Sequence, residues 1–337
     1  MRFRQRKRTV ASVFFGVNRE LEEIQKRENA LGRGKSVSGV EHLALKALDE
    51  TLLGHVAAYH HVTKYQLARL LQKETSRNYI GERLKYLTEH GLLHSQCLPR
   101  TLPSGKSPYV YSLTQKGALY CEQIAYITDV IPSSAGYLQH TLELNDVLIA
   151  SALLEKKEPA ITRVEMQHER VLKHHPIFVL GEHGKAEKLI PDAFVRFALS
   201  PPFGRVGEQM GLCMELDRNH EDVWQYKAKV QRYCRFADGI YEATFGLQAL
   251  TVAVVVTDGG QERVYQLLTW TEQELTRLKK QDYAPYFLYA SVAPGEIDPV
   301  WLFCSPLWVQ PFCRDTTTLL RSLASYTRFP LIEKRFA

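Results

Sequence analysis

The sequence predicts an α+β protein in which a mostly helical region precedes a region of mixed strands and helices. Between residues 41 and 127, apolar residues recur mainly at helical spacing, and one two-stranded segment interrupts them. Beyond residue 137, strand-like runs alternate with helical ones, which is typical of α/β or α+β domains. With 337 residues, 45% of them hydrophobic, the chain is long enough for two or three ordinary domains.

Three parts are predicted along the chain. Residues 1–38 form a basic arm and a linker that is rich in glycine and serine. Residues 39–131 form the helical domain, which ends where the sequence IPSSAG breaks the helical pattern. Residues 137–337 form the mixed domain, and its last stretch, from about residue 286, is rich in aromatic residues and proline and has no clear period.

The N-terminal arm concentrates positive charge in a chain whose formal net charge is +6. Residues 2–8 hold five basic side chains and no acid, and Arg4, Arg6 and Arg8 are the candidates within it for contacts with phosphate. The alternative is a solvated tail that only improves solubility. A basic balance permits a polyanionic partner without proving one.

Composition also narrows the class of protein. The six cysteines are scattered without a CxxC pair, so neither a disulfide framework nor a structural zinc site is indicated. No secretory signal is seen, and no apolar run approaches the roughly 20 residues that a membrane span needs. We therefore expect a cytoplasmic protein without a membrane partner.

Three helices are predicted in the helical domain. The first covers residues 41–59, the second begins at Thr63, and the third begins near Thr75, which is a good N-cap residue, and ends at Gly91. The last two helices carry apolar residues at helical spacing: Leu67, Leu70, Leu71, Ile80, Leu84 and Leu87.

The opposite face of the third helix is polar. It carries Asn78, Glu82 and Lys85, with Arg77 beside them, and these side chains reach base edges or phosphates in DNA complexes. The N-terminal part of such a helix enters the major groove in helix-turn-helix proteins, which makes Arg77 and Asn78 the best candidates for base contacts. The alternative is an ordinary solvated helix face.

Two strands, at residues 92–98 and 109–113, follow the third helix and flank a polar loop that carries Arg100 and Lys106. The string GLLHSQCL, then this loop, then YVYSLTQKG resembles the winged helix-turn-helix domains of bacterial DNA-binding regulators. The resemblance implies binding to double-stranded DNA, with the two basic residues of the wing on the backbone or in the minor groove. A winged helix used only for protein contacts is the alternative.

The mixed domain carries carboxylates at predicted strand ends. Glu215 and Asp217 point to one face of a strand because side chains alternate, and Asp192 opens a neighbouring strand. Converging carboxylates suit Mg²⁺ or Mn²⁺, and Glu165 on the first strand is a further candidate ligand. Alternatively, Asp192 caps a turn, and Glu215 pairs with Arg218 or a helix lysine.

This order resembles the restriction-endonuclease-like fold, in which Pro-Asp on one strand is followed by Glu-x-Lys on the next. Asp217 stands here where that pattern has lysine, and lysine occurs instead on the following helix, at Lys227 and Lys229. The resemblance implies a catalytic set of Asp192, Glu215, Asp217 and Lys227, with Asp192 and Glu215 as metal ligands.

The combination of both halves is similar to the replication-relaxation family of bacterial plasmids and integrated mobile elements. The residues that carry this similarity are His140, Leu142, Asn145, Asp146, Val147, Pro191, Asp192, Glu215, Leu216, Asp217, Arg218, Lys227 and Tyr233. The resemblance implies a DNA-binding role in plasmid replication, transfer or relaxation, alongside other proteins of those processes.

Three functions remain open. The first is a DNA-binding accessory or initiator protein of a mobile element, which Asp217 in place of lysine favours. The second is a metal-dependent endonuclease or nickase, which the convergent carboxylates favour. The third is a transcriptional regulator, which a homodimer bound to a palindromic DNA site would favour. The phosphate-binding motif GxxxxGK[ST] and the nucleophile motif GxSxG are both absent, so ATP-driven chemistry and serine hydrolysis are disfavoured.

Overall fold

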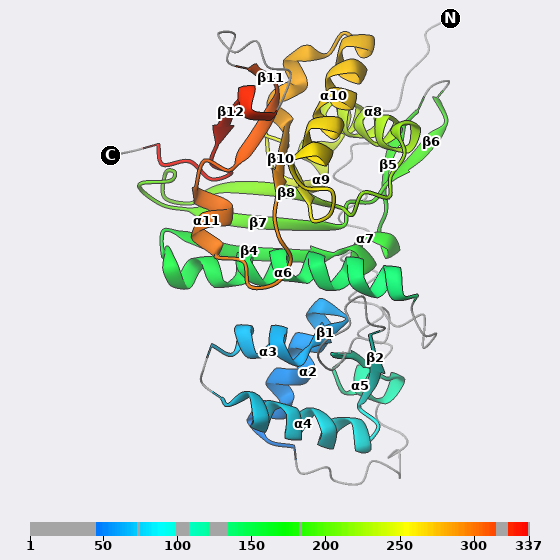
Figure 1. Ribbon diagram of the computed structural model, residues 1–337, viewed down its shortest axis with the longest axis vertical. Helices are drawn as coiled ribbons and strands as arrows, with labels where there is room; N and C mark the ends of the chain where they lie inside the picture. Colours follow the sequence, from blue (N-terminus) through cyan, green and yellow to red (C-terminus); the bar gives the residue numbers. More distant parts are fainter. Residues whose placement is uncertain are drawn as a thin grey trace, which may run out of the picture. The chain divides into compact units, whose positions relative to one another are not determined.

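The computed structural model describes residues 45–72, 75–98, 108–121, 134–181, 184–314 and 323–335. The chain divides into two compact units, Met1–Lys46 and Ala47–Ala337, and the description below concerns the second. It is a mixed α+β structure, as predicted (Figure 1).

The first part of this unit has the element order of a winged helix. Its strands pair antiparallel in the order β1-β3-β2, so the hairpin β2–β3 follows the helix pair α3–α4. In chain order the elements are α2 (Ala47–Tyr59), β1 (Val62–Thr63), α3 (Lys64–Leu70), α4 (Arg77–Glu89), β2 (Leu93–Cys97), β3 (Tyr109–Leu113) and α5 (Gln115–Tyr120).

Local chemistry sets the ends of these helices. Thr63 and Gln66 form a reciprocal capping box at the start of α3. Ser76, one residue after the predicted Thr75, caps α4 by accepting a hydrogen bond from the Tyr79 backbone N–H. Gly91 follows α4 with a φ of +70°, a conformation that glycine adopts at little cost, so the predicted helix end is confirmed.

The second part is built on a seven-stranded sheet in the order β12-β11-β10-β9-β8-β7-β4. Strands β4, β7 and β8 form an antiparallel meander, β8, β9 and β10 are parallel, and β11 and β12 are antiparallel again. The strands are β4 (Ile161–His168), β5 (Ile177–Leu180), β6 (Ala186–Leu189), β7 (Ala193–Leu199), β8 (Glu208–Asp217), β9 (Val252–Val256), β10 (Phe287–Ser291), β11 (Trp308–Arg314) and β12 (Tyr326–Phe329), of which β5 and β6 pair separately.

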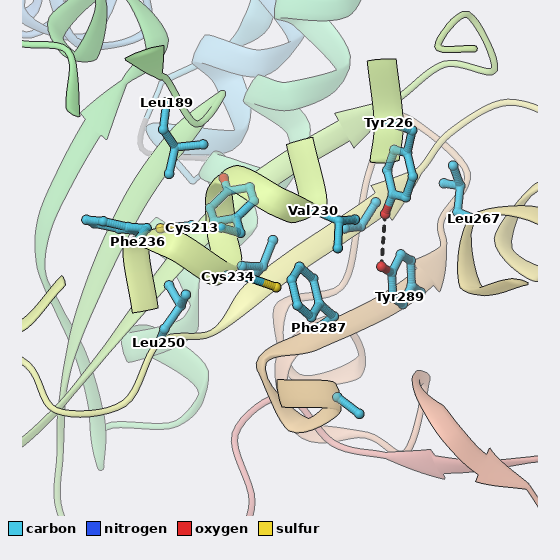
Figure 2. Packing of buried hydrophobic residues seen from close by; sticks show 14 of the residues in the cluster. Leu189, Cys213, Tyr226, Val230, Cys234, Phe236, Leu250, Leu267, Phe287 and Tyr289 are labelled. Atoms are coloured by element: carbon cyan, nitrogen blue, oxygen red, sulfur yellow. Dashed lines mark hydrogen bonds between the residues drawn. The ribbon is translucent and has the colours of Figure 1, made fainter. Parts of the chain in front are cut away.

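Helices α8 and α10 pack on each other beside the parallel strands. In this core Tyr226 of α8 donates a hydrogen bond to the hydroxyl of Tyr289 on β10, at 2.9 Å (Figure 2). The helices of this part are α6 (Ala135–Lys157), α7 (Glu169–His174), α8 (Val223–Gly239), α9 (Tyr241–Phe245), α10 (Gly260–Leu278) and α11 (Pro299–Cys304), with 3-10 turns η3 (Gln281–Tyr286) and η4 (Leu323–Ser325).

Helix α6 is buried along most of its middle, including polar residues. It contacts α3 and β1 of the winged-helix part as well as β4 and α11, so little of its surface is left for solvent. Burial on several sides obliges its polar side chains to find partners within the protein.

One predicted element needs correction, and two features were not predicted. The strand predicted to carry Glu165 ends at His168, and the chain continues as α7. The hairpin of β5 and β6 was not predicted. The C-terminal stretch, which has no clear sequence period, supplies β10, β11 and β12 to the sheet. Among the described helices, none is long and apolar enough to span a membrane.

Candidate functional site

Helix α4 separates an apolar face from a polar one. Ile80, Leu84 and Leu87 are fully buried, because α4 packs on α2 and α3. Arg83 fixes the packing on α2 through two hydrogen bonds of 2.7 and 2.6 Å to the buried carboxylate of Asp49. The rest of the helix surface is thereby turned outward.

The residues predicted to contact DNA lie on this outward face. Arg77, Asn78, Glu82 and Lys85 are all exposed. Arg77 lies 3.7 Å from the carboxylate of Glu296, with 61% and 75% of the two side chains exposed, so water competes strongly with this ion pair. The other predicted contacts, Arg4, Arg6, Arg8, Arg100 and Lys106, lie outside the described residues.

The sheet brings Asp192 and Glu215 together. Asp192 precedes β7, whose Ala193 pairs with Met214 of β8, so its carboxylate lies at the end of the neighbouring strand. There Oδ2 accepts a hydrogen bond of 2.8 Å from the backbone N–H of Leu216 and lies 3.4 Å from Nε2 of His140. Burial opposes ionisation of Asp192, but His140, Lys229 and the Leu216 N–H together outweigh it and hold the pKa of Asp192 below its usual value.

Glu215 is held by two donors from α8. Tyr233 donates its hydroxyl to Oε1 at 2.5 Å, and Lys229 donates from Nζ to Oε2 at 2.8 Å. Lys229 also lies 2.6 Å from Oε1 of Glu221. Burial raises the pKa of Glu215, whereas Glu215 and Glu221 together raise the pKa of Lys229 against the effect of its own burial. Lys229 is therefore the positive charge that these carboxylates surround. We call Asp192, Glu215, Glu221 and Lys229 the cluster around Lys229.

A cavity of about 260 Å³ opens above the cluster. His140, Asp192, Glu221 and Lys229 line it, whereas Glu215 is 4% exposed and lies beneath them. The remaining lining residues are Gly136, Leu216, Asp217, Arg218 and His220. The cavity therefore presents both acidic and basic groups to whatever enters it.

Two residues of the predicted catalytic set are engaged elsewhere. Asp217 borders the cavity, but Arg263 of α10 holds both of its oxygens at 2.8 and 2.9 Å, and each side chain is 4% exposed. Lys227 points away and donates to Oε1 of Gln273 at 2.8 Å. The predicted ligand Glu165 forms an ion pair of 2.9 Å with Arg196, which bonds in turn to residues outside the cluster.

In this arrangement the bonded carboxylate oxygens of Asp192 and Glu215 are not free to bind a divalent cation. Mg²⁺ and Mn²⁺ favour several oxygen ligands around one point. Both oxygens of Glu215 are already bonded, and Oδ2 of Asp192 accepts the Leu216 N–H. Within the described ranges, no group of three or more histidine, cysteine, aspartate or glutamate residues is arranged to hold a metal ion.

The sequence analysis did not predict the structural role of two polar residues in α6, Asn145 and Asp146. Asn145 is fully buried and donates to the backbone carbonyls of Tyr59 and His61 at 3.0 and 2.7 Å. These carbonyls lie between α2 and β1, so Asn145 attaches the winged-helix part to α6. The available signal was an amide in the middle of an apolar helical stretch, where a polar group needs a buried partner.

Asp146 joins three segments that are far apart in the sequence. Its Oδ1 accepts hydrogen bonds from Gln66 and Arg69 of α3 at 3.0 and 3.2 Å, and its Oδ2 accepts the Gly295 N–H at 2.7 Å. Arg69 also donates to the carbonyls of Gly295 and Ile297. Burial raises the pKa of Asp146 to about 6, although Gln66 and Arg69 oppose the rise. We call these residues the Asp146 junction.

Comparison with known proteins assigns the family. The family model described as replication-relaxation matches residues 53–250. A solved structure titled "Multiple Antibiotic Resistance Repressor, MarR" is 18% identical and covers 45% of this chain and 96% of its own, but its TM-score of 0.21 is too low to indicate a shared fold. No curated protein matches the chain. Because the family model covers more than half of the sequence, the chain belongs to the replication-relaxation family.

Proposed function

We propose that this protein binds double-stranded DNA and acts in the replication, transfer or relaxation of a plasmid or mobile element. Membership of the replication-relaxation family supports the process. The observation that carries the binding role is α4 itself, the second helix of the α3–α4 pair, whose outward face exposes Arg77 and Asn78 in its first turn. That is the part of a recognition helix that meets base edges.

In this proposal α4 enters the major groove with its N-terminus leading. Arg77 is suited to guanine and Asn78 to adenine, because each forms two hydrogen bonds with that base. Glu82 is suited to the amino group of cytosine, and Lys85 to a phosphate. The loop between β2 and β3 contacts the backbone through Arg100 and Lys106, and residues 2–8 add phosphate contacts that are independent of sequence.

The test is fluorescence anisotropy with labelled duplexes at several salt concentrations. Arg77→Ala and Asn78→Ala are expected to lose about 1–3 kcal/mol of discrimination between preferred and unrelated duplexes. Lys188→Ala, which removes an exposed lysine from β6, is the matched control. Deletion of residues 2–8 is expected to weaken binding to all duplexes and flatten the salt dependence. Equal affinity in wild type and both α4 variants would remove α4 from the interface.

A metal-dependent endonuclease or nickase is the second candidate, and it requires a metal to displace the protein donors that now hold Asp192 and Glu215. With α7, the β5–β6 hairpin and α9 inserted among them, the elements α6, β4, β7, β8, α8 and β9 combine an antiparallel meander with a parallel crossover, which is the order expected for a restriction-endonuclease-like core. Its carboxylates Asp192 and Glu215 lie together, with Lys229 in the place of the predicted Lys227.

Supercoiled plasmid distinguishes the two candidates. It is incubated with the protein and Mg²⁺, Mn²⁺ or chelator, beside an Asp192→Ala variant. Metal-dependent nicking that disappears in the variant would establish the nuclease. Tight binding without nicking, equal in both proteins, would leave a DNA-binding protein with a nuclease-like fold.

A further inference from the structure

The charge arrangement around Lys229 bears directly on whether Asp192 and Glu215 hold a metal. Lys229 bonds to Glu215 at 2.8 Å and to Glu221 at 2.6 Å, and the charge of Asp192 also acts on it. One ammonium group is thus bonded to two carboxylates and lies in the electrostatic field of a third. Only 21% of its side chain is exposed, so these anions take the place of most of its hydration.

The position of this ammonium is fixed by the helix that carries it. Lys229 lies three residues after Tyr226 and four before Tyr233, both of which are buried against the sheet. Tyr233 additionally donates to the same carboxylate that Lys229 holds. The lysine is therefore directed to the carboxylates by a packed helix face.

We propose that Lys229 is a built-in counter-ion, whose ammonium group occupies the position that a divalent cation would need between Asp192, Glu215 and Glu221. A cation there would have to displace Lys229 from the carboxylates of Glu215 and Glu221. It would also have to displace the Tyr233 hydroxyl from Glu215. It would also bring a second positive charge against the ammonium. The native protein accordingly binds neither Mg²⁺ nor Mn²⁺ at this cluster.

The test measures Mn²⁺ binding directly, by loss of the electron paramagnetic resonance signal of the free aqueous ion, and by the shift in thermal unfolding temperature with Mn²⁺ concentration. The proteins are the full chain, Lys229→Ala and Lys227→Ala. Lys227 is the matched control, because it lies on the same helix but bonds to Gln273 instead. Lys229→Gln replaces Lys229→Ala if the alanine variant does not fold.

The expected result is no saturable Mn²⁺ binding by the native chain or by Lys227→Ala, and a gain of saturable binding by the Lys229 variant with a rise in unfolding temperature. Adding Asp192→Asn to the Lys229 variant should abolish that gain. Saturable binding by the native chain that Asp192→Asn removes would overturn the proposal. So would the absence of binding in the Lys229 variant, or equal gains in the two lysine variants.

This inference is independent of DNA binding through α4. Both readouts use the metal alone, without DNA, so failure of the counter-ion proposal leaves the anisotropy result for Arg77 and Asn78 unaffected. Loss of DNA binding by the α4 variants would, in turn, say nothing about Lys229.

Discussion

The outward face of α4 and the cluster around Lys229 are both rich in charge, but they differ in how that charge is used. On α4, Lys85 is 77% exposed and meets Glu89 at 3.7 Å, and Arg77 meets Glu296 at the same distance. In the cluster, Lys229 is 21% exposed and is held at 2.6 and 2.8 Å by two carboxylates.

This difference shows that the density of charged residues does not by itself mark a site. Exposed pairs at long distance contribute little to stability, so those groups are available to an external partner such as a phosphate or a base. Buried groups with short contacts are already committed, and removing one leaves the others uncompensated. Substitutions in the buried network should therefore change folding, and substitutions on α4 should change binding.

The largest effect is expected at Arg263, whose guanidinium group holds the buried carboxylate of Asp217. Arg263→Met leaves that carboxylate without its counter-ion and should lower the free energy of unfolding by about 3–5 kcal/mol. Urea denaturation measures the loss. Lys227→Met removes only the exposed hydrogen bond to Gln273, so its free energy of unfolding should stay within about 0.5 kcal/mol of wild type. A small loss for Arg263→Met would show that water reaches Asp217.

The pH dependence of stability tests the Asp146 junction. The pKa of Asp146 is raised from 3.8 to about 6, so the folded chain holds this proton more tightly than the unfolded chain does. The resulting stabilisation is full below pH 3.8 and is lost as the pH rises through about 6, with a size on the order of 2–3 kcal/mol. Urea midpoints measured between pH 4 and pH 7 detect it.

Asp146→Asn provides the comparison, because it cannot titrate. It should lower stability through the lost bond to the Gly295 N–H, but its midpoint should vary less with pH than that of wild type. Parallel curves for the two proteins would assign the pH dependence to other groups.

A pair of asparagines compares a buried hydrogen-bonding side chain on α6 with an exposed one on α4. Asn145→Ala removes two buried hydrogen bonds and should cost about 1–3 kcal/mol of unfolding free energy. Asn78→Ala, on the outward face of α4, should change stability by no more than about 0.5 kcal/mol while altering duplex preference. The comparison fails if Asn78→Ala proves the more destabilising of the two.

The smallest effect is expected at Glu296. Glu296→Gln removes the exposed partner of Arg77 and should leave stability within about 0.5 kcal/mol of wild type. Because Arg77 is then released, duplex affinity at low salt should rise slightly, and the gain should vanish at high salt. A loss of affinity would show that Glu296 itself contributes to binding.

Local patterns were sufficient for much of the fold. Helix α4 and the hairpin β2–β3 follow from apolar spacing, caps and Gly91, all of which act within a few residues. The alternation of β8 correctly predicted that Glu215 and Asp217 point to one face of the strand; in the structure their partners there come from α8 and α10. The strands after residue 286 escaped prediction because they are short, and β11 and β12 pair irregularly.

At the candidate site, prediction from the sequence was limited mainly because the interaction partners of a residue can lie far from it in the chain. Arg263 is 46 residues from Asp217, and nothing in the local pattern links them. Lys229 was within reach of the sequence, because it lies three residues after Tyr226 and four before Tyr233, both of which are buried in α8. Helical phase alone does not separate it from Lys227, which is also half-buried; their different partners, Glu215 and Gln273, do.

The Asp146 junction bears on how such proteins can be recombined. Protein engineers often treat a winged helix as a cassette that can be cut out and grafted onto another partner. Here the cassette would leave behind Asn145 and Asp146, and also the loop at Gly295, about 180 residues beyond β3, the last winged-helix strand. A working chimera would therefore have to exchange α6 and that loop together with the winged-helix part, or redesign all three surfaces.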